Sequence, residues 1–309
     1  SSFEFWYDTI PRETAVARHD LYTRRELLSG LPGQTVGVAA SLLKVRGPAY
    51  LFSGTCSSGA IAVGHAYREI RWGEVDVAIA TGHDNALVAP LYAMYRDASL
   101  LTREETDPQR AVRPYVDHST NAFGEGALSL VLEERRHAEA RGAPILAHVT
   151  GYGYGNNGYH PTTVDVAGVR PSEIIQQVLG RAGVGVEDVA FVVGHGNGVH
   201  LSDVSEENYM RRVFGARSAS VPLISTKPIY GHTLGASSMI NIAAAALMVR
   251  HGYVIPTINV DERRVKRAAH HQPNRGVERP CPAGVAVSYG MGGHNTVLLV
   301  EPPAARAGG

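Results

Sequence analysis

The chain has few cysteines and no excess of either charge, and each scarcity excludes a class of protein. Only Cys56 and Cys281 occur among 309 residues, so a disulfide framework is excluded, although a single bridge is not. The 29 basic and 29 acidic residues cancel, so no net charge favours binding to nucleic acid or to an anionic membrane.

Long apolar runs are also absent from the sequence. No run approaches the roughly 18 residues expected of a membrane span, and the opening residues Ser-Ser-Phe-Glu-Phe do not form a signal peptide. We therefore expect a soluble, cytoplasmic protein that has neither nucleic acid nor a membrane among its partners.

Cys56 stands where a predicted strand turns into a predicted helix. The apolar residues 49–52 precede it, and the small residues of segment 58–63 follow it. A cysteine at a helix N-terminus lies at the positive end of the helix dipole, which favours the thiolate over the thiol. The position predicts a nucleophile; the alternative is a buried structural cysteine.

Two histidines and a lysine occupy comparable positions later in the chain. His195 lies in the sequence Gly-His-Gly-Asn-Gly, and Lys227 precedes His232 in the pattern Lys-x4-His. Open α/β sheets place their chemistry at the carboxyl ends of strands. The strand-like runs that precede these residues are 189–193 and 221–224. The alternatives are histidines of an ordinary core and a solvated surface lysine.

The order of these motifs resembles that of the β-ketoacyl-acyl carrier protein synthases and polyketide ketosynthases of the thiolase superfamily. The cysteine, the histidine, Lys-x4-His and then Tyr-Gly-Met-Gly-Gly-His-Asn at 289–295 carry the resemblance. It extends from about Thr35 to Val300. Further matching pieces are 113–117, 123–126, Asp203-x-x-Glu206, 213–215 and 256–259.

This resemblance implies a five-layer αβαβα fold made of two pseudo-repeated halves. Residues 1–143 then form an N-terminal half that contains the nucleophile, and residues 144–309 form a C-terminal half that contains both histidines. The N-terminal half is expected to be incomplete, because about the first hundred residues of the family have no counterpart here. The sequence is a fragment, or a segment was omitted before numbering, or a second polypeptide supplies these strands.

The hydrophobic patterns agree with alternating helices and strands. The expected helices are 35–43, 56–72, 171–182, 202–214 and 234–249. The expected strands are 49–54, 75–81, 127–132, 145–149, 189–193 and 221–224, followed by a hairpin of 284–289 and 296–300.

The resemblance also assigns an acyl-binding role to Cys56. Its thiol attacks the acyl thioester of a carrier protein and retains the chain as a thioester. The backbone N–H groups of Cys56 and Met291 form the oxyanion hole. Gly290 and Gly292 allow the backbone to approach the thioester and form part of the gate.

The two histidines are implied to act on the second substrate. His195 and His232 donate hydrogen bonds to the thioester carbonyl of a malonyl unit while carbon dioxide leaves. Lys227 and Glu206 belong to the network that holds His195. Asp203, three residues before Glu206, shares its helix face and gives structural support.

Two departures from the family pattern affect substrate binding. Asn197 and Val199 stand where the family has threonines that bind the pantetheine arm, and valine offers no hydrogen-bonding group. The usual phenylalanine of the terminal glycine-rich loop is Met291, which is a flexible side chain. We expect altered pantetheine binding and different gating.

The predicted function is decarboxylative Claisen condensation of an acyl-cysteine with malonyl-acyl carrier protein, in fatty acid or polyketide synthesis. An acyltransferase that forms an ester or amide without decarboxylation is one alternative, and a non-catalytic partner like a chain-length factor is another. The expected partners are an acyl carrier protein and a second ketosynthase-like subunit, in a homodimer or heterodimer. No metal or resident cofactor is expected, because phosphopantetheine arrives on the carrier protein.

Overall fold

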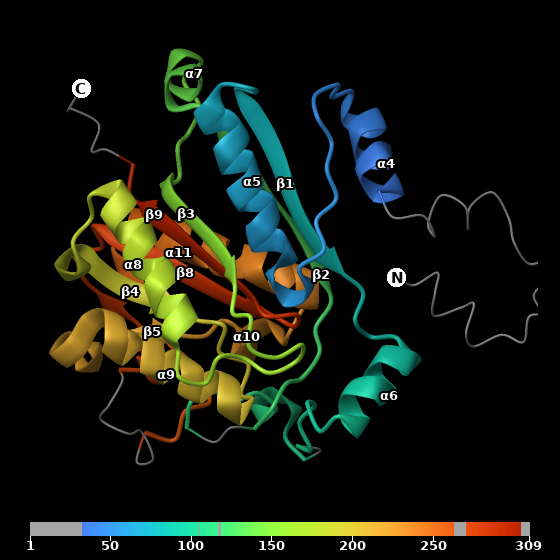
Figure 1. Ribbon diagram of the computed structural model, residues 1–309, viewed down its shortest axis with the longest axis vertical. Coiled ribbons are helices and arrows are strands. Elements are labelled where there is room, and N and C mark those ends of the chain that lie inside the picture. Colours follow the sequence, from blue (N-terminus) through green and yellow to red (C-terminus); the bar gives the residue numbers. More distant parts are fainter. Residues whose placement is uncertain (1–32, 105, 117–118, 263–269, 304–309) are drawn as a thin grey trace, which may run out of the picture. The chain divides into compact units, whose positions relative to one another are not determined.

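A computed structural model describes residues 33–104, 106–116, 119–262 and 270–303 (Figure 1). The chain divides into two compact units, Ser1–Phe52 and Ser53–Gly309. Within the described residues, no helix combines the length and apolar character that crossing a membrane requires.

The described part of the first unit contains one helix, α4 (Gln34–Leu43), which confirms the helix predicted over 35–43. Gly33 and Lys44 flank it in left-handed conformations. The strand predicted over 49–54 is wrong, because these residues adopt no regular secondary structure. A strand requires a hydrogen-bonded neighbour, and no described strand pairs with this segment.

The second unit is built on a five-stranded mixed sheet with the order β3–β9–β8–β4–β5. β4 pairs in parallel with β5 and β8, whereas β9 is antiparallel to β3 and β8. The strands are β3 (His148–Asn156), β4 (Val189–Val193), β5 (Leu223–Ile224), β8 (Ala283–Gly290) and β9 (His294–Glu301). Every residue of β4 and β8 is buried, which explains their continuous apolar sequences.

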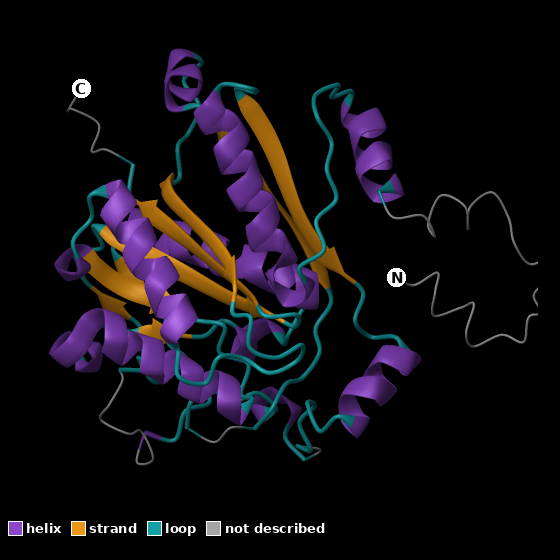
Figure 2. Ribbon diagram, viewed as in Figure 1, coloured by secondary structure: helices purple, strands orange, loops and turns teal. Residues whose placement is uncertain are grey.

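Helices cover both faces of this sheet (Figure 2). α8 (Val169–Ala182) and α9 (His200–Phe214) lie on one face, and α5 (Ser58–Trp72) and α11 (Ser237–His251) lie on the other. α8 ends at Gly183 in the left-handed conformation that favours glycine. The predicted helices over 56–72, 171–182, 202–214 and 234–249 are confirmed with small changes at their ends.

A second sheet packs on the other side of α5 and α11. It is the antiparallel pair of β1 (Val77–Asp84) and β2 (Gly126–Glu133). The order of layers is therefore helices, sheet, helices, sheet, which are four of the five layers of the predicted αβαβα fold. On the outer face of this pair, Val77, Ile79 and Val131 are exposed.

The two sheets repeat one succession of elements. In each case a short 3₁₀ turn leads into a helix of the middle layer, and an antiparallel strand pair follows. The first series is η2, α5 and then β1 and β2, which α6 and η3 separate; the second is η6, α11 and then β8 and β9, with β6 and β7 between α11 and β8. Each turn begins with a non-glycine residue of positive φ, Thr55 at 50° and Leu234 at 42°. The predicted boundary at 143/144 falls in the loop between α7 and β3; the division into two halves stays a prediction.

The remaining elements are short. The helices are α6 (Ala89–Asp97), α7 (Arg135–Ala140) and α10 (Lys227–Tyr230), and the strands are β6 (Tyr253–Val254) and β7 (Val277–Glu278). The 3₁₀ turns are η2 (Thr55–Ser57), η3 (Pro108–Arg110), η4 (Val186–Asp188), η5 (Gly215–Ala219) and η6 (Leu234–Ala236).

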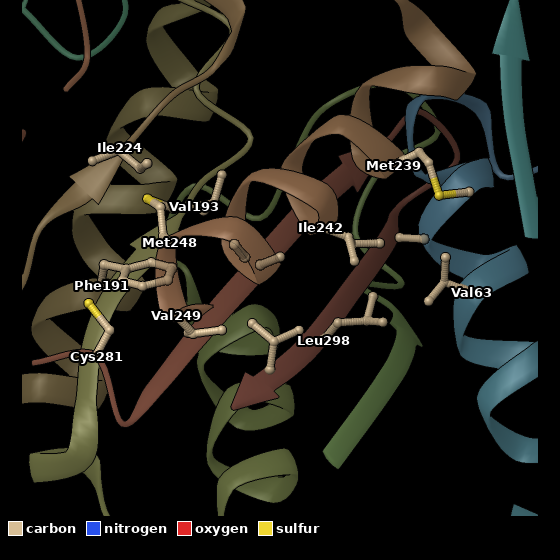
Figure 3. Packing of buried hydrophobic residues seen from close by; sticks show 14 of the residues in the cluster. Val63, Phe191, Val193, Ile224, Met239, Ile242, Met248, Val249, Cys281 and Leu298 are labelled. Carbon is tan, nitrogen blue, oxygen red and sulfur yellow. The ribbon is translucent and has the colours of Figure 1, made fainter. Parts of the chain in front are cut away.

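The main core lies where α11 meets the large sheet and α5 (Figure 3). Met239 and Ile242 of α11 pack near Val63 of α5 and Leu298 of β9, and all four side chains are buried. Small residues of α5 and α11 allow these helices to fit between two sheets. This packing fixes the N-terminal ends of α5 and α11, and the candidate site lies beside both.

Candidate active site

Cys56 is buried in the turn η2, at the start of α5. Its apolar surroundings include Ala86, Leu234 and the ring of Tyr95. The Nε2 atom of His232 lies 3.1 Å from the Cys56 Sγ atom, which is within hydrogen-bonding distance for sulfur. The structure thus brings the predicted nucleophile into contact with one of the two predicted histidines.

Burial opposes ionisation of this thiol. Removal from water raises the pKa of Cys56 to about 11, although Lys227, the Cys56 backbone N–H and the hydroxyl of Thr55 each favour the thiolate. The helix N-terminus favours the thiolate, and burial opposes it. Cys56 is a thiol at neutral pH and needs a proton acceptor, and His232 Nε2 lies beside it.

His232 is held in one orientation through its ring and through its backbone. Its Nδ1 atom lies 2.8 Å from the hydroxyl of Ser237 at the start of α11. Its backbone N–H donates to the carbonyl of Ala122 at 2.7 Å. With Nδ1 and the backbone both held, Nε2 remains directed at Cys56.

His195 completes the group of reactive side chains. Its ring centroid lies 5.4 Å from that of His232, and the two rings are nearly perpendicular at 84°. Burial, followed by the charge of Lys227, holds the pKa of both histidines well below the usual range. Both imidazoles are therefore neutral at pH 7, and each can donate one hydrogen bond.

Lys227 and Glu206 hold the backbone next to His195 from opposite directions. The buried ammonium of Lys227 donates to the His195 carbonyl. The backbone N–H of Gly196 donates to Glu206 Oε1 at 2.6 Å. The two side chains thus bracket the peptide between residues 195 and 196, and neither is a surface residue.

Burial also shifts these two groups toward their neutral forms. It raises the pKa of Glu206 to about 8 and lowers the pKa of Lys227 to about 8. The hydroxyl of Tyr209 donates to Glu206 Oε2 at 3.2 Å, and the hydroxyl of Tyr115 does so at 3.3 Å. Asp203 accepts from the backbone N–H of Tyr115 at 2.7 Å. This carboxylate supports the loop that carries Tyr115.

The glycine-rich turn at 290–293 packs against the nucleophile turn. A Cβ atom on Gly290 would lie 2.3 Å from the Gly54 carbonyl oxygen, so the close approach requires glycine there. The carbonyl of Met291 accepts from the hydroxyl of Thr55 at 3.2 Å, and Gly292 has a φ of 88°. Gly290, Met291 and Gly292 therefore lie at the predicted place beside Cys56.

Asn197 is buried in the loop that carries His195, and Val199 is half-buried at its end. Asn197 Oδ1 accepts from the backbone N–H of Val199 at 3.0 Å. This bond closes a local turn before α9, and it occupies the side-chain oxygen that would otherwise face a ligand.

Sequence reasoning missed several residues of the site: Thr55, Tyr95, Tyr115 and Ser237. Tyr115 lies in the Arg-Pro-Tyr segment, one of the pieces that match the family, so the sequence indicates its position but not its contact with Glu206. Ser237 begins α11, and only the fold shows that its hydroxyl faces His232. Tyr95 reaches Met291 from α6, a helix that the sequence did not predict.

A separate pocket of about 420 Å³ lies among residues 99–104, 113 and 119–120. Its lining contains neither Cys56 nor either of the two histidines; it consists of Ser99, Leu101, Thr102, Arg103, Glu104, Arg113, Ser119 and Thr120. The candidate chemistry is therefore not located there.

Comparison with known proteins gives matches along most of the chain. Residues 12–138 match the N-terminal domain of β-ketoacyl synthase, and residues 146–261 match its C-terminal domain. The 3-oxoacyl-[acyl-carrier-protein] synthase 2 of Rhizobium meliloti (strain 1021) is 33% identical over 88% of this chain and 66% of its own. Nodulation protein E of the same strain is 33% identical over 90% of this chain and 68% of its own. The chain spans about two thirds of the length of these curated relatives.

Solved structures confirm the predicted thiolase-like fold. One is AntDE:AntF, a type II PKS acyl-carrier protein in complex with its ketosynthase bound to the hexaketide. Its TM-score is 0.88 with 27% identity, over 92% of this chain and 70% of that one. The ishigamide ketosynthase/chain length factor has a TM-score of 0.81 with 30% identity, over 91% of this chain and 71% of that one.

Proposed function

The chain belongs to the β-ketoacyl synthase family, and from this premise we propose that it catalyses decarboxylative Claisen condensation. An acyl group held on Cys56 would be joined to a malonyl unit carried by an acyl carrier protein. The observation that carries this proposal is the 3.1 Å contact of Cys56 Sγ with His232 Nε2, with a second neutral histidine, His195, beside it. Acyl transfer to the cysteine requires one base to accept the thiol proton. Decarboxylation is assisted by two hydrogen-bond donors to the thioester carbonyl of the malonyl unit.

The first step is acyl transfer to the cysteine. The proton of the Cys56 thiol moves to His232 Nε2, and the thiolate attacks the thioester carbonyl of the acyl carrier. The tetrahedral intermediate expels the carrier thiolate, which takes the proton back from His232. The backbone N–H groups of Cys56 and Met291 stabilise the oxyanion, and Gly290 and Gly292 give the backbone its close approach.

The second step is decarboxylation of the malonyl unit. For this step His232 takes the tautomer that carries its proton on Nε2 and accepts at Nδ1 from the Ser237 hydroxyl. Neutral His195 and His232 then each donate to the thioester carbonyl, and the C–C bond electrons flow into the enolate as carbon dioxide leaves. Lys227 and Glu206 preserve the orientation of His195 through the peptide they bracket. Asp203 supports the loop that carries Tyr115.

The third step forms the new carbon–carbon bond. The enolate carbon attacks the acyl-thioester carbonyl on Cys56, and the Cys56 thiolate leaves and takes one proton from water, which balances the negative charge of the malonyl carboxylate. The product is a β-ketoacyl group on the carrier protein. The enzyme is thus an acyltransferase of the condensing type, and no metal or resident cofactor enters any of these steps.

The pantetheine arm of the carrier would pass Asn197 and Val199. Asn197 keeps its amide NH₂ for the arm, since its oxygen is engaged by Val199. Valine can offer only an apolar contact. We expect weaker polar binding of the arm than a pair of threonines would give.

The proposed partners are an acyl carrier protein and a second ketosynthase-like subunit. Two solved structures support this proposal, one with a carrier protein and one with a chain length factor. The product is a fatty acid or a polyketide. The alternatives are an ester- or amide-forming acyltransferase and a non-catalytic partner.

Peptide mass spectrometry tests the proposal. The purified protein is incubated with acyl-carrier thioester, and separately with malonyl carrier while carbon dioxide release is measured. We expect an acyl adduct on Cys56, none on Cys281, and loss of the adduct in Cys56→Ala. Acylation of Cys56 without carbon dioxide release would favour the ester- or amide-forming alternative, and absence of any adduct would favour the non-catalytic one.

A further inference from the structure

Two hydroxyl groups lie beside the imidazole of His232, at the ring nitrogen that does not contact Cys56. Ser237 Oγ lies 2.8 Å from His232 Nδ1, and Thr233 Oγ1 lies 3.1 Å from Ser237 Oγ. The other ring nitrogen, Nε2, lies 3.1 Å from Cys56 Sγ. A continuous row of hydrogen-bonding contacts therefore runs from Thr233 through Ser237 and His232 to the nucleophile.

This row is removed from water. His232, Thr233 and Ser237 are 1%, 2% and 4% exposed. Among the residues that the structure describes, the two ring nitrogens have Ser237 Oγ and Cys56 Sγ as their hydrogen-bonding partners. A buried polar group without a partner is costly. These two side chains therefore determine which nitrogen of the neutral ring carries the proton.

The Ser237 hydroxyl suits both tautomers of the ring, because a hydroxyl donates one hydrogen bond and accepts others. With the ring proton on Nδ1, Ser237 accepts from the ring and donates its own proton to Thr233. With the ring proton on Nε2, Thr233 donates to Ser237, which donates to Nδ1. Both tautomers carry one ring proton, so exchange between them leaves the total number of protons unchanged.

The two half-reactions require different tautomers of His232. Acceptance of the Cys56 thiol proton requires a free lone pair on Nε2, and hence the ring proton on Nδ1. Donation to the thioester carbonyl of the malonyl unit requires the ring proton on Nε2.

Resting on the proposed function, we propose that Ser237 is a positioning residue that keeps His232 available as a base for acyl transfer. Its oxygen is the acceptor that stabilises the tautomer with the proton on Nδ1. When His232 acts as a donor in decarboxylation, the same hydroxyl turns and donates to Nδ1. One serine thus allows one histidine to serve both half-reactions.

Ser237→Ala tests this role, because it leaves the Cys56 sulfur as the described partner of the ring. A buried N–H group needs an acceptor, so the ring proton should move to Nε2. We expect alkylation of Cys56 by iodoacetamide at neutral pH to become about tenfold slower, because Nε2 no longer accepts the thiol proton. Carbon dioxide release from malonyl carrier should be retained, because the Nε2 donor is present.

The tautomer itself is read from the nitrogen-15 chemical shifts of the His232 ring, in protein labelled with nitrogen-15 histidine. The signals of His232 are those lost in His232→Gln. We expect the protonated fraction of Nδ1 to fall in Ser237→Ala and that of Nε2 to rise. Ser237→Thr keeps the hydroxyl and should resemble the unmodified protein in alkylation, carbon dioxide release and ring spectrum.

Ser172→Ala is the matched control. Ser172 is also a buried serine in the first turn of a helix, but it lies on α8 and its hydroxyl donates to the Val169 carbonyl at 2.6 Å. Its substitution should change none of the measurements. If Ser237→Ala does not fold, Ser237→Cys replaces it with shifts in the same direction, because a thiol is a weak acceptor. Peptide mass spectrometry then separates alkylation of Cys56 from alkylation of the new thiol.

Unchanged alkylation or an unchanged tautomer in folded Ser237→Ala would overturn the proposal. An equal loss of alkylation and of carbon dioxide release would also overturn it, because the site would then be disturbed as a whole, and so would an equal effect of Ser172→Ala. Alkylation and the ring spectrum require no carrier protein. A protein in which Cys56 reacts with iodoacetamide but accepts no acyl group would therefore contradict the proposed function, while the role of Ser237 is still decided by these two measurements.

Discussion

Burial raises the pKa of the Cys56 thiol and hydrogen bonding lowers it, and the effect of burial is the larger. The helix N-terminus favours a thiolate, yet removal from water raises the pKa of the thiol to about 11. The nucleophile is therefore formed only when His232 Nε2 accepts its proton at 3.1 Å.

The residue types and their order were predictable from the sequence, whereas the contacts between them were not. Gly-His-Gly and Lys-x4-His indicated which side chains matter. No pattern indicated that Lys227 would bind the backbone carbonyl of His195 rather than its ring. The contact of Lys227 with this carbonyl depends on the burial of the lysine side chain, and that burial is determined by the tertiary fold.

His195→Ala separates decarboxylation from acyl transfer. His195 faces the ring of His232, and it is His232 whose Nε2 contacts Cys56. We expect the variant to retain acyl transfer to Cys56 and to lose carbon dioxide release from malonyl carrier by about two to three orders of magnitude. His232→Ala is the comparison: it should lose carbon dioxide release as well, and it should also acylate more slowly at neutral pH. Unchanged carbon dioxide release in His195→Ala contradicts the assignment.

Among the elements, long and fully buried segments were the most predictable. β4 follows its predicted bounds because a continuous apolar run suits a strand covered on both faces. The strand predicted over 49–54 failed because no described strand supplies its hydrogen bonds. α6 was missed because only Leu91 and Tyr95, one turn apart, are half-buried against the cluster of Cys56, and so narrow an apolar face gives a weak helical pattern.

Because α5 approaches β3 closely, we expect a glycine-to-alanine substitution in α5 to destabilise the protein, which is the opposite of its usual effect in a helix. Alanine normally stabilises a helix relative to glycine by about 0.5–1 kcal/mol. A Cβ atom on Gly64 would lie 2.1 Å from the ring of Tyr152, so the ring must move. We expect Gly64→Ala to lower the free energy of unfolding by about 1–3 kcal/mol in denaturant titration.

Gly180 in α8 provides the matched control for this change. It is exposed, and a Cβ atom there would meet no other atom within 4 Å, so Gly180→Ala should stabilise the protein by up to about 1 kcal/mol. Equal effects of the two substitutions would show that helix propensity, rather than packing between α5 and β3, determines the result.

At the scale of the whole molecule, the two sheets differ in how they are covered. The five-stranded sheet has helices on both faces, whereas the β1–β2 pair has an outer face that leaves Ile79 and Val131 exposed at 44% and 63%. These residues are cross-strand partners, so their side chains form one apolar patch. A two-stranded sheet is only marginally stable by itself, and covering this face would stabilise it.

We expect a second copy of the chain to cover this face in the purified protein, because identical surfaces pack on each other around a twofold axis. Light scattering should show a mass that increases with concentration beyond that of the 309-residue monomer. Ile79→Lys with Val131→Lys should reduce this association, because ammonium groups would have to be desolvated in the contact. Leu201→Lys on α9, where the leucine is 44% exposed, is the control and should associate like the unmodified chain. A mass that stays monomeric at every concentration, or an equal effect of the control, would mean that the outer face of β1–β2 does not bind a second copy.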